Sequence, residues 1–251
     1  MSEDWRPESP MRYCEATLPT VEENLALDEA FLLQADAGEG VPILRLWEPL
    51  APAVVLGASR RLREDVLVEN CEADGVAIAR RSSGGGTVVI GPGTINASVI
   101  LRDDAAPGLA AVDTAQQFVL ERFARSLRAA VPGIEILGLG DFAVAGRKFA
   151  GSAQRRLKRW FLVHITVLDD FPLPRISRYL ARPGREPDYR RGRSHEDFLM
   201  NLGIGRKIVR DALRRAWLPS SRDVPSAPIP RDLVRALVSE KFSDPAWVER
   251  F

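Results

Sequence analysis

The chain has 251 residues, 45% hydrophobic and 27% charged, an ordinary balance for a globular protein of one large domain or a domain with a small appendage. Its formal net charge of +1 gives no overall field that would attract nucleic acid or an anionic membrane. No apolar run approaches the roughly 20 residues of a membrane helix, and the polar, acidic residues 1–10 are unlike a signal peptide.

Cysteine and histidine are scarce in this chain. Cys14 and Cys71 are too few for a disulfide framework and lack a metal-binding spacing, which fits a reducing cytoplasm. The two histidines, His164 and His195, are too few for a histidine-rich metal centre, so we assign no metal site. We therefore predict a cytoplasmic protein without nucleic-acid or membrane partners.

The first third of the chain mixes helices and short strands. Thr20 and Glu23 fit a capping box, in which each side chain accepts from the other's backbone N–H, and predict a helix to about residue 36. Prolines between residues 47 and 53 fit a connection better than a central strand. Strands are expected at residues 43–47, 53–57 and 76–79, with one helix at residues 61–73.

The middle of the chain is typical of a strand meander interrupted by one long helix. Asp113 is expected to cap that helix, which runs to about residue 130 with Val119 and Phe123 on its apolar face. Helices and strands do not alternate regularly, which disfavours a doubly wound parallel sheet. We expect an α+β fold with a mixed, largely antiparallel sheet packed with helices, including strands at residues 95–101, 134–137, 142–145, 148–155 and 160–168.

Proline and arginine dominate residues 171–193, where a short helix is expected near residues 176–180. Ser194 is expected to cap a turn, and residues 204–218 have the pattern of an amphipathic helix. A proline- and serine-rich stretch follows. The predicted organisation is one domain over residues 1–218, then a linker and a short helical tail over residues 219–251.

Two arginines and three consecutive glycines stand out at residues 80–86, Arg-Arg-Ser-Ser-Gly-Gly-Gly. Glycine has no Cβ, so the backbone can approach a ligand closely and direct its N–H groups at it. Arginines beside such a loop suit a phosphate or a carboxylate. On spacing alone, a β-hairpin with glycine turns and a solvated arginine pair is an equally good interpretation.

Other known fingerprints fit this chain poorly. The glycine loop lacks the lysine of a Walker loop. Residues 138–143 fit G-x-G-x-x-[GA], but a strand and turn follow where a dinucleotide site needs a helix N-terminus. A triad of Ser82 or Ser83 with His164 and Asp141 is disfavoured, because no strand-to-helix elbow surrounds those serines.

A lysine lies within the predicted strand at residues 148–155, in the sequence Gly-Arg-Lys-Phe-Ala-Gly-Ser-Ala-Gln of residues 146–154. A strand lysine is usually a solvated edge residue that discourages aggregation. If Lys148 points into a pocket instead, it supplies a cation for a phosphate or a developing oxyanion.

Together, the two motifs resemble the lipoate–protein ligase A family, within the biotin/lipoate ligase superfamily. Residues 79–86 are similar to the family's signature loop, and residues 146–154 to its lysine motif. Weaker landmarks at residues 24–29 and 44–47 stand in the right order, so the resemblance covers about residues 20–217.

The resemblance implies a reaction and its partners. Lipoate or octanoate is activated by ATP, carrying Mg2+, to an acyl-adenylate. The acyl group then passes to a lysine on the lipoyl domain of a 2-oxoacid dehydrogenase E2 or on the glycine-cleavage H protein. The acceptor lysine belongs to the protein substrate, so the enzyme needs positioning and electrostatic stabilisation rather than its own nucleophile.

Carried over by position, the resemblance makes Lys148 catalytic, in contact with the acyl carbonyl and the phosphate. Residues 1–218 become the catalytic domain. The residues expected to bind ATP or the acyl group are Arg81, Gly84, Gly85, Gly86, Thr87, Val88, Val89, Asp141, Ser152, Ala153 and His164. For His164, a role as a core histidine has equal weight.

The chain also departs from the family pattern. Many members continue the glycine loop with an aromatic-His-Asp triplet, where this chain has Val89-Ile90-Gly91, so the polar contacts that the triplet makes are absent here. The Gly-Pro-Gly turn at residues 91–93 is more similar to the octanoyltransferase branch. Well-studied ligases carry a C-terminal accessory domain, which about 30 residues cannot form.

Three activities therefore stay open. An ATP-dependent ligase, with a separate accessory subunit, is the first. The second is an octanoyltransferase that takes its acyl group from acyl carrier protein or coenzyme A; one branch places its nucleophilic cysteine where this chain has residues 138–140, Gly-Leu-Gly. The third is a non-catalytic lipoyl-binding homologue. The arginine-rich residues 155–193 are either a solvated face or a docking face for an acidic lipoyl domain or carrier protein.

Overall fold

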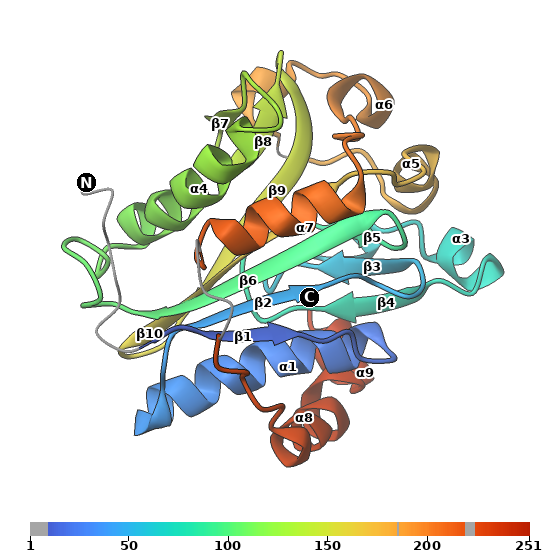
Figure 1. Ribbon diagram of the computed structural model, residues 1–251. Helices are drawn as coiled ribbons and strands as arrows, with labels where there is room; N and C mark the ends of the chain where they lie inside the picture. Colours follow the sequence, from blue (N-terminus) through green and yellow to red (C-terminus); the bar gives the residue numbers. More distant parts are fainter. Residues whose placement is uncertain (1–9, 185, 219–223) are drawn as a thin grey trace.

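The structure is a computed structural model that describes residues 10–184, 186–218 and 224–251. Its main sheet has seven strands, and every neighbouring pair is antiparallel except β1 and β2. The expected mixed, largely antiparallel sheet is therefore confirmed (Figure 1). In spatial order the strands are β1 (Arg12–Glu15), β2 (Ile43–Trp47), β6 (Thr94–Arg102), β10 (Trp160–Leu168), β9 (Arg147–Arg156), β8 (Asp141–Val144) and β7 (Glu135–Leu137).

A second sheet of three strands carries the glycine loop. Its order is β4 (Ala77–Arg80), β3 (Ala53–Leu56) and β5 (Val88–Ile90), with β3 parallel to β4 and antiparallel to β5. Residues 81–87 thus connect the two outer strands across the end of β3. Both ends of the glycine loop are anchored in the same small sheet.

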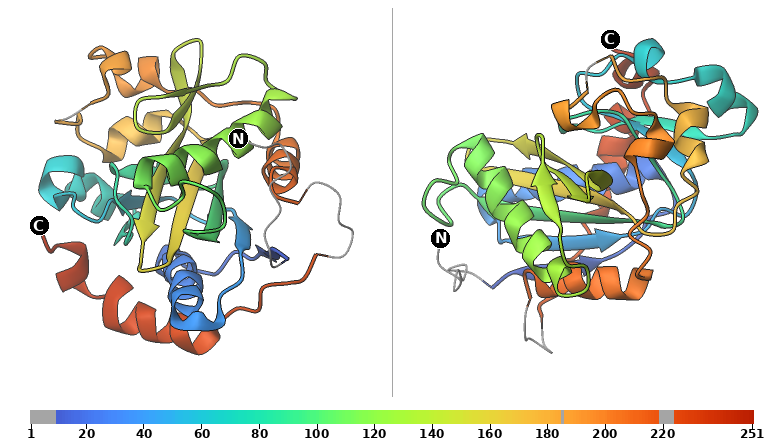
Figure 2. Two further views of the ribbon diagram at one scale, coloured as in Figure 1. Left: turned by 90° about the vertical axis from the view of Figure 1, so that its left-hand side faces the viewer. Right: turned by 90° about the horizontal axis from the view of Figure 1, so that it is seen from above.

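Helices cover both faces of the main sheet. Helix α1 (Val21–Gln34) packs on one face, while α4 (Val112–Arg128) and α7 (Arg206–Arg215) pack on the other (Figure 2). The capping box of α1 is confirmed, since Thr20 Oγ1 accepts from the Glu23 N–H at 3.2 Å and the Glu23 carboxylate accepts from the Thr20 N–H at 3.0 Å. A π-helical turn, Ala35–Glu39, follows α1.

Two local predictions in these helices are wrong. Asp113 does not cap α4, because the helix begins one residue earlier with Ala111 as its N-cap; Asp113 lies in the first turn. The single helix expected at residues 61–73 is two short helices, α2 (Leu62–Asp65) and α3 (Val68–Ala73). Between them Val66 is extended and forms a β-bridge with Leu180, so a distant pairing outweighs local helical propensity.

Short helices follow the meander. The expected cap is confirmed, because Ser194 Oγ accepts from the Asp197 N–H at 3.1 Å and begins α6. The elements between the meander and the C-terminal segment are α5 (Pro174–Tyr179), the 3-10 turn Asp188–Arg190, α6 (His195–Phe198) and α7. Within the described ranges, each helix is too short or too polar to cross a bilayer.

The C-terminal segment, residues 224–251, packs against the rest of the chain (Figure 2). It holds two α-helices rather than the one expected, α8 (Arg231–Leu237) and α9 (Pro245–Val248), separated by the π-helical Val238–Phe242. It passes α1, where Lys241 Nζ lies 2.7 Å from Glu29 Oε1, and reaches β4 of the small sheet. The expected linker covers residues 219–230, of which residues 219–223 lie outside the described residues.

Candidate active site

The glycine loop is shaped from inside by Arg81. Its buried guanidinium donates through Nη2 to the Gly84 carbonyl at 2.6 Å and the Gly86 carbonyl at 2.7 Å, and through Nη1 to the Val55 carbonyl at 3.2 Å. Burial lowers the pKa of Arg81 to about 10, and the side chain stays charged at neutral pH. Arg81 therefore orders the loop; a direct contact with ATP stays a prediction.

The loop carbonyls that face Arg81 leave the loop N–H groups available. The Gly84 N–H donates to the Gln154 carbonyl at 3.3 Å. The N–H groups of Gly85, Gly86 and Thr87 have no hydrogen-bond partner in the described part of the chain. Gly85 and Gly86 are exposed, and Gly85 has a φ of +85°. Successive free N–H groups in a turn suit an anion such as a phosphate.

The side chains of Thr87 in the loop and of Val88 and Val89 in β5 are engaged within the protein. Thr87 Oγ1 donates to Asp65, which also accepts from Arg60 Nε at 2.6 Å. Burial alone would raise the pKa of Asp65, but the hydrogen bonds from Arg60 and Thr87 outweigh it and lower that pKa. The side chains of Val88 and Val89 pack into two apolar clusters. Their backbone is thus the part that a ligand can meet.

Lys148 lies in the interior of the main sheet. Its strand β9 lies between β10 and β8, and Lys148 itself is flanked by Ala143 of β8 and by Leu199, with which it forms a β-bridge, so the alternative of an edge-strand lysine is wrong. Lys148 Nζ lies 2.7 Å from Asp141 Oδ1, and the lysine side chain is 24% exposed. The ammonium also lies over Gly151, because a Cβ built there would be 3.0 Å from Nζ. Any other residue at position 151 would displace the lysine.

His164 of β10 meets the glycine loop at Ser83. The distance from Ser83 Oγ to His164 Nε2 is 2.6 Å, and Ser83 is buried. Burial, with a smaller effect of Arg81, lowers the pKa of His164 to about 3, so the imidazole is neutral at physiological pH. Asp141 does not complete a triad with this pair, because its two oxygens bind Lys148 and Tyr189.

The loop, His164 and Lys148 meet on one face of the sheet. His164 is in register with Ala153, and two residues along β10, on the same face, Thr166 is in register with Gly151, over which the Lys148 ammonium lies. Gly85 covers this row, since a Cβ built on it would be 3.5 Å from Ala153 Cβ. A ligand on the loop would therefore also lie on the sheet face that carries Lys148.

A buried donor is left over on the same face. Thr166 Oγ1 donates to Asn96 Oδ1 at 2.6 Å, while Asn96 Nδ2 is buried without a partner in the described chain. An unpaired buried donor is costly, so Asn96 is a group that a bound ligand would satisfy. The sequence motifs gave no signal for it.

Ser152, by contrast, directs its side chain to the α4 side of the sheet. Its hydroxyl donates to the Gly140 carbonyl at 2.7 Å and accepts from Gln116 Nε2 at 3.0 Å. Gly140 has a φ of +118°, and a Cβ there would lie 2.4 Å from Ser152 Oγ. Ser152 thus fixes the turn that leads into Asp141.

The family model for the lipoyl protein ligase A/B catalytic domain matches residues 20–211. The chain belongs to this family. A putative lipoate-protein ligase A from Aeropyrum pernix is 34% identical over 156 residues, 62% of this chain and 56% of that protein. An octanoyltransferase LipM from Carboxydothermus hydrogenoformans is 24% identical over 91% of this chain and 94% of that protein. The chain spans about half the length of the curated lipoate-protein ligases that it matches in sequence.

Solved structures share the fold of this ligase-family chain. The bi-partite lipoate protein ligase of Thermoplasma acidophilum superposes with a TM-score of 0.81 at 24% identity, over 98% of both chains. A lipoate-protein ligase A bound with ATP superposes with a TM-score of 0.81 at 23% identity, over 96% of this chain and 98% of that one. The predicted family and its sheet architecture are confirmed.

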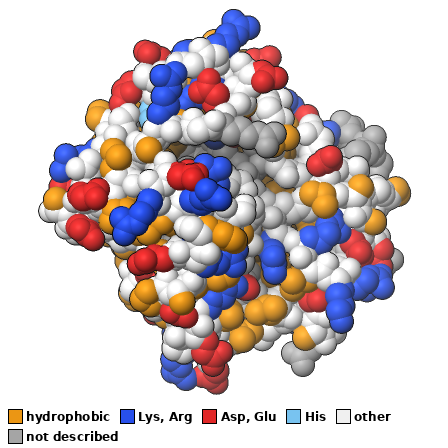
Figure 3. Space-filling view, turned by 180° about the vertical axis from the view of Figure 1, so that it is seen from behind, with side chains coloured by type: hydrophobic (Ala, Val, Ile, Leu, Met, Phe, Trp, Pro, Cys, Tyr) orange, Lys and Arg blue, Asp and Glu red, His pale blue; other side chains and the backbone are white. Residues whose placement is uncertain are grey.

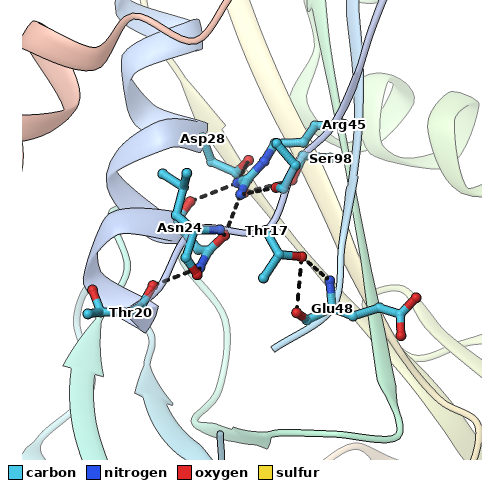
Figure 4. Close-up of polar contacts among 9 residues, drawn as sticks. Thr17, Thr20, Asn24, Asp28, Arg45, Glu48 and Ser98 are labelled. Carbon is cyan, nitrogen blue, oxygen red and sulfur yellow. Dashed lines mark hydrogen bonds and ion pairs between the residues drawn. The ribbon is translucent and has the colours of Figure 1, made fainter. Parts of the chain in front are cut away.

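The two weaker family landmarks meet beside this site (Figure 4). Arg45 of β2 binds α1, with Nη1 2.7 Å from Asp28 Oδ1 and Nη2 2.6 Å from Asn24 Oδ1. Ser98 Oγ donates to the other Asp28 oxygen at 2.7 Å, and Ser98 is in register with His164. This ion pair, whose arginine is buried, holds α1 across the face that carries His164.

Several arginines of the ligase-family chain have structural roles within residues 186–193. Arg190 and Arg193 lie over the Phe198 ring at 4.9 and 5.2 Å, and Arg193 Nη2 donates to the Gly146 carbonyl at 2.9 Å. On the face shown in Figure 3, basic and acidic side chains are interspersed. A docking face for an acidic domain stays a prediction.

The two cysteines of the chain are buried and free, Cys14 on β1 and Cys71 in α3. Among the described residues, no group of three or more His, Cys, Asp or Glu side chains is arranged to hold a metal ion.

Proposed function

We propose that this protein is an ATP-dependent lipoate–protein ligase. The observation that carries the proposal is that a cation and two hydrogen-bond donors lie on one face of the sheet. The cation is the Lys148 ammonium, and the donors are the backbone N–H groups of Gly85 and Gly86, which have no partner among the described residues. Acyl activation develops negative charge on a phosphate and on a carbonyl oxygen, and fixed donors at those places stabilise it.

The proposed reaction has two steps. A carboxylate oxygen of lipoate or octanoate attacks the α-phosphorus of ATP, and pyrophosphate leaves to give the acyl-adenylate. The ε-amine of an acceptor lysine then attacks the acyl carbon, loses a proton, and AMP leaves as the amide forms. We assign the phosphates to the loop N–H groups and the oxygens near the acyl carbon to Lys148. Mg2+ would enter bound to the ATP phosphates.

Solved relatives support the choice of ligands. One neighbour is a lipoate-protein ligase A bound with ATP, and another is a putative lipoate protein ligase with bound lipoic acid. A third is a bi-partite ligase described with its E2 lipoyl domain. We propose a lipoyl domain of a 2-oxoacid dehydrogenase E2, or the glycine-cleavage H protein, as acceptor, with a separate accessory subunit.

Octanoyl transfer from a thioester is the second candidate. It is favoured by the sequence match to octanoyltransferase LipM over 91% of this chain and 94% of that protein, while the sequence matches to two lipoate-protein ligases cover 45% and 56% of those proteins. Against it, the turn at residues 138–140 carries no cysteine, and Cys14 and Cys71 are buried in β1 and α3.

Mass spectrometry of an acceptor lipoyl domain separates the candidates. One reaction contains lipoate, ATP and Mg2+, and the other contains octanoyl carrier protein without ATP. We expect a lipoyl mass increment in the first only. Acylation in the second only would make the protein a transferase. No acylation in either, with an accessory subunit added, would indicate a non-catalytic homologue.

A further inference from the structure

A tyrosine far along the chain completes the Lys148 ion pair. The Tyr189 hydroxyl donates to Asp141 Oδ2 at 2.8 Å, and the other oxygen of the same carboxylate lies 2.7 Å from Lys148 Nζ. Asp141 thus receives one neutral and one charged donor. Because both its oxygens are engaged, its orientation is fixed by Tyr189 as well as by the lysine.

Tyr189 is itself held by a segment bound to the β8–β9 hairpin. We call residues 186–199 the strap. At its centre the Tyr189 ring packs on Phe198, with centroids 5.1 Å apart. Arg193 donates to the Gly146 carbonyl in the turn of the hairpin at 2.9 Å, and Arg147 of β9 donates to the Leu199 carbonyl at 2.6 Å. The strap therefore follows the hairpin that carries both Asp141 and Lys148.

The phenol also packs against the turn that precedes Asp141. A Cβ built on Gly138 would lie 3.5 Å from Tyr189 Cε1 and 3.3 Å from Pro187 Cβ. Burial, and then the neighbouring Asp141 charge, raise the pKa of Tyr189, so its hydroxyl keeps its proton and remains a donor across the physiological range. The Tyr189 hydroxyl therefore remains available to donate to Asp141 throughout that range.

We propose that Tyr189 is a positioning residue for Lys148, acting through Asp141; this inference rests on the proposed role of Lys148. The phenol takes up part of the carboxylate's charge and fixes its rotamer. The lysine is then held in place without being fully neutralised by its partner. Without the phenol, Asp141 would bind Lys148 more tightly and weaken its attraction to an acyl phosphate.

The test compares Tyr189→Phe with Tyr179→Phe. Tyr179 is a matched control, because its hydroxyl also donates to a carboxylate, Asp74, at 2.8 Å, away from the loop. Both variants keep the ring and lose one hydrogen bond. We expect Tyr189→Phe to lower kcat for acyl transfer about tenfold, equivalent to about 1.4 kcal/mol, with KM values for ATP and lipoate within about twofold. Tyr179→Phe should keep wild-type kcat.

A double-mutant cycle and a labelling experiment complete the design. On an Asp141→Asn background, Tyr189→Phe should have no further effect on kcat, because it acts through Asp141. Independently of activity, the rate at which acetic anhydride labels Lys148 at a fixed pH, read by peptide mass spectrometry, should fall in Tyr189→Phe and be unchanged in Tyr179→Phe.

The outcomes distinguish this inference from the proposed function. If the wild-type protein forms no acyl-adenylate, the proposed function fails and the labelling rate alone decides the role of Tyr189. An unchanged rate of Lys148 labelling in Tyr189→Phe overturns the inference, and so does a loss of kcat that is additive with Asp141→Asn. A lowered labelling rate supports the inference in either case.

Discussion

Deleting residues 244–251 tests whether the C-terminal segment is part of the glycine-loop scaffold. Arg80, which leads directly into the loop, has 0% of its surface exposed. Its Nε donates to the carbonyls of Trp247 and Val248, both at 3.0 Å, and Nη2 donates to the Val248 carbonyl at 2.6 Å. In return, Trp247 Nε1 donates to the Arg80 carbonyl at 2.9 Å.

The deletion removes every acceptor of two guanidinium nitrogens of Arg80. Its third nitrogen, Nη1, keeps the carbonyls of Gly57 at 2.9 Å and Arg60 at 2.6 Å. A hydrogen bond to a charged group contributes about 1.5–3 kcal/mol. After the deletion, water will hydrogen-bond to the exposed guanidinium nitrogens and recover part of this free energy. We therefore expect a total loss of about 3 kcal/mol, which lowers the Tm of a chain of this size by about 6–12 °C.

Thermal unfolding followed by circular dichroism measures the Tm, and isothermal titration calorimetry measures the affinity of the glycine loop for ATP. We expect the deletion to lower both the Tm and the ATP affinity. Deleting only residues 249–251 is the matched control, because it keeps the Trp247 and Val248 carbonyls. Trp247→Phe removes one neutral hydrogen bond and should lower the Tm by about 2–4 °C. A 244–251 deletion with wild-type Tm and ATP affinity would refute the reasoning.

Three further predictions concern the site itself. Lys148→Ala should abolish acyl transfer and keep the wild-type Tm within a few degrees; near-normal turnover in a mass-spectrometric assay would remove the lysine from the mechanism. Gly85→Ala should weaken ATP binding about tenfold by titration calorimetry, because Gly85 has a φ of +85° and a Cβ would meet Arg81 Nη2 at 3.0 Å. Gly84→Ala, with open space at its Cβ, is the control, and equal losses in the two would contradict the argument. The pKa of His164 is lowered to about 3 in the folded chain, so below pH 6.5 this histidine binds a proton in the unfolded chain but not in the folded chain. Stability should therefore fall by up to about 1.4 kcal/mol per pH unit as the pH decreases from 6.5 toward 3, and be unaffected by this group above 6.5. Urea unfolding of His164→Gln should lack this part of the decrease, whereas His195→Gln should retain it.

Patterns confined to neighbouring residues were predictable from the sequence. The capping box of Thr20 needs only residues three apart, and the strand at β2 has the expected bounds, Ile43–Trp47. The glycine loop and Lys148 were found through local motifs. Their convergence was not visible in either motif, because it depends on the register between β9 and β10.

Contacts between distant segments account for what could not be predicted. Tyr189 and Asp141 are 48 positions apart, and Arg80 and Val248 are 168 apart, so no periodicity or spacing links them. The same cause split the helix expected at residues 61–73, where Val66 pairs with Leu180. In each case tertiary pairing decided the outcome, and a single sequence carries no direct record of it.

The beginning of the C-terminal segment has a second consequence, for solubility. The Tyr13 N–H donates to the Pro225 carbonyl and the Ala227 N–H to the Tyr13 carbonyl, both at 2.9 Å, so residues 225–227 cover part of the open edge of the main sheet at β1. An uncovered edge strand is a template for pairing with another chain and for aggregation. A truncation beginning at residue 224 would expose β1 and add self-association to any effect on the loop. Removing residues 244–251 alone leaves that edge covered.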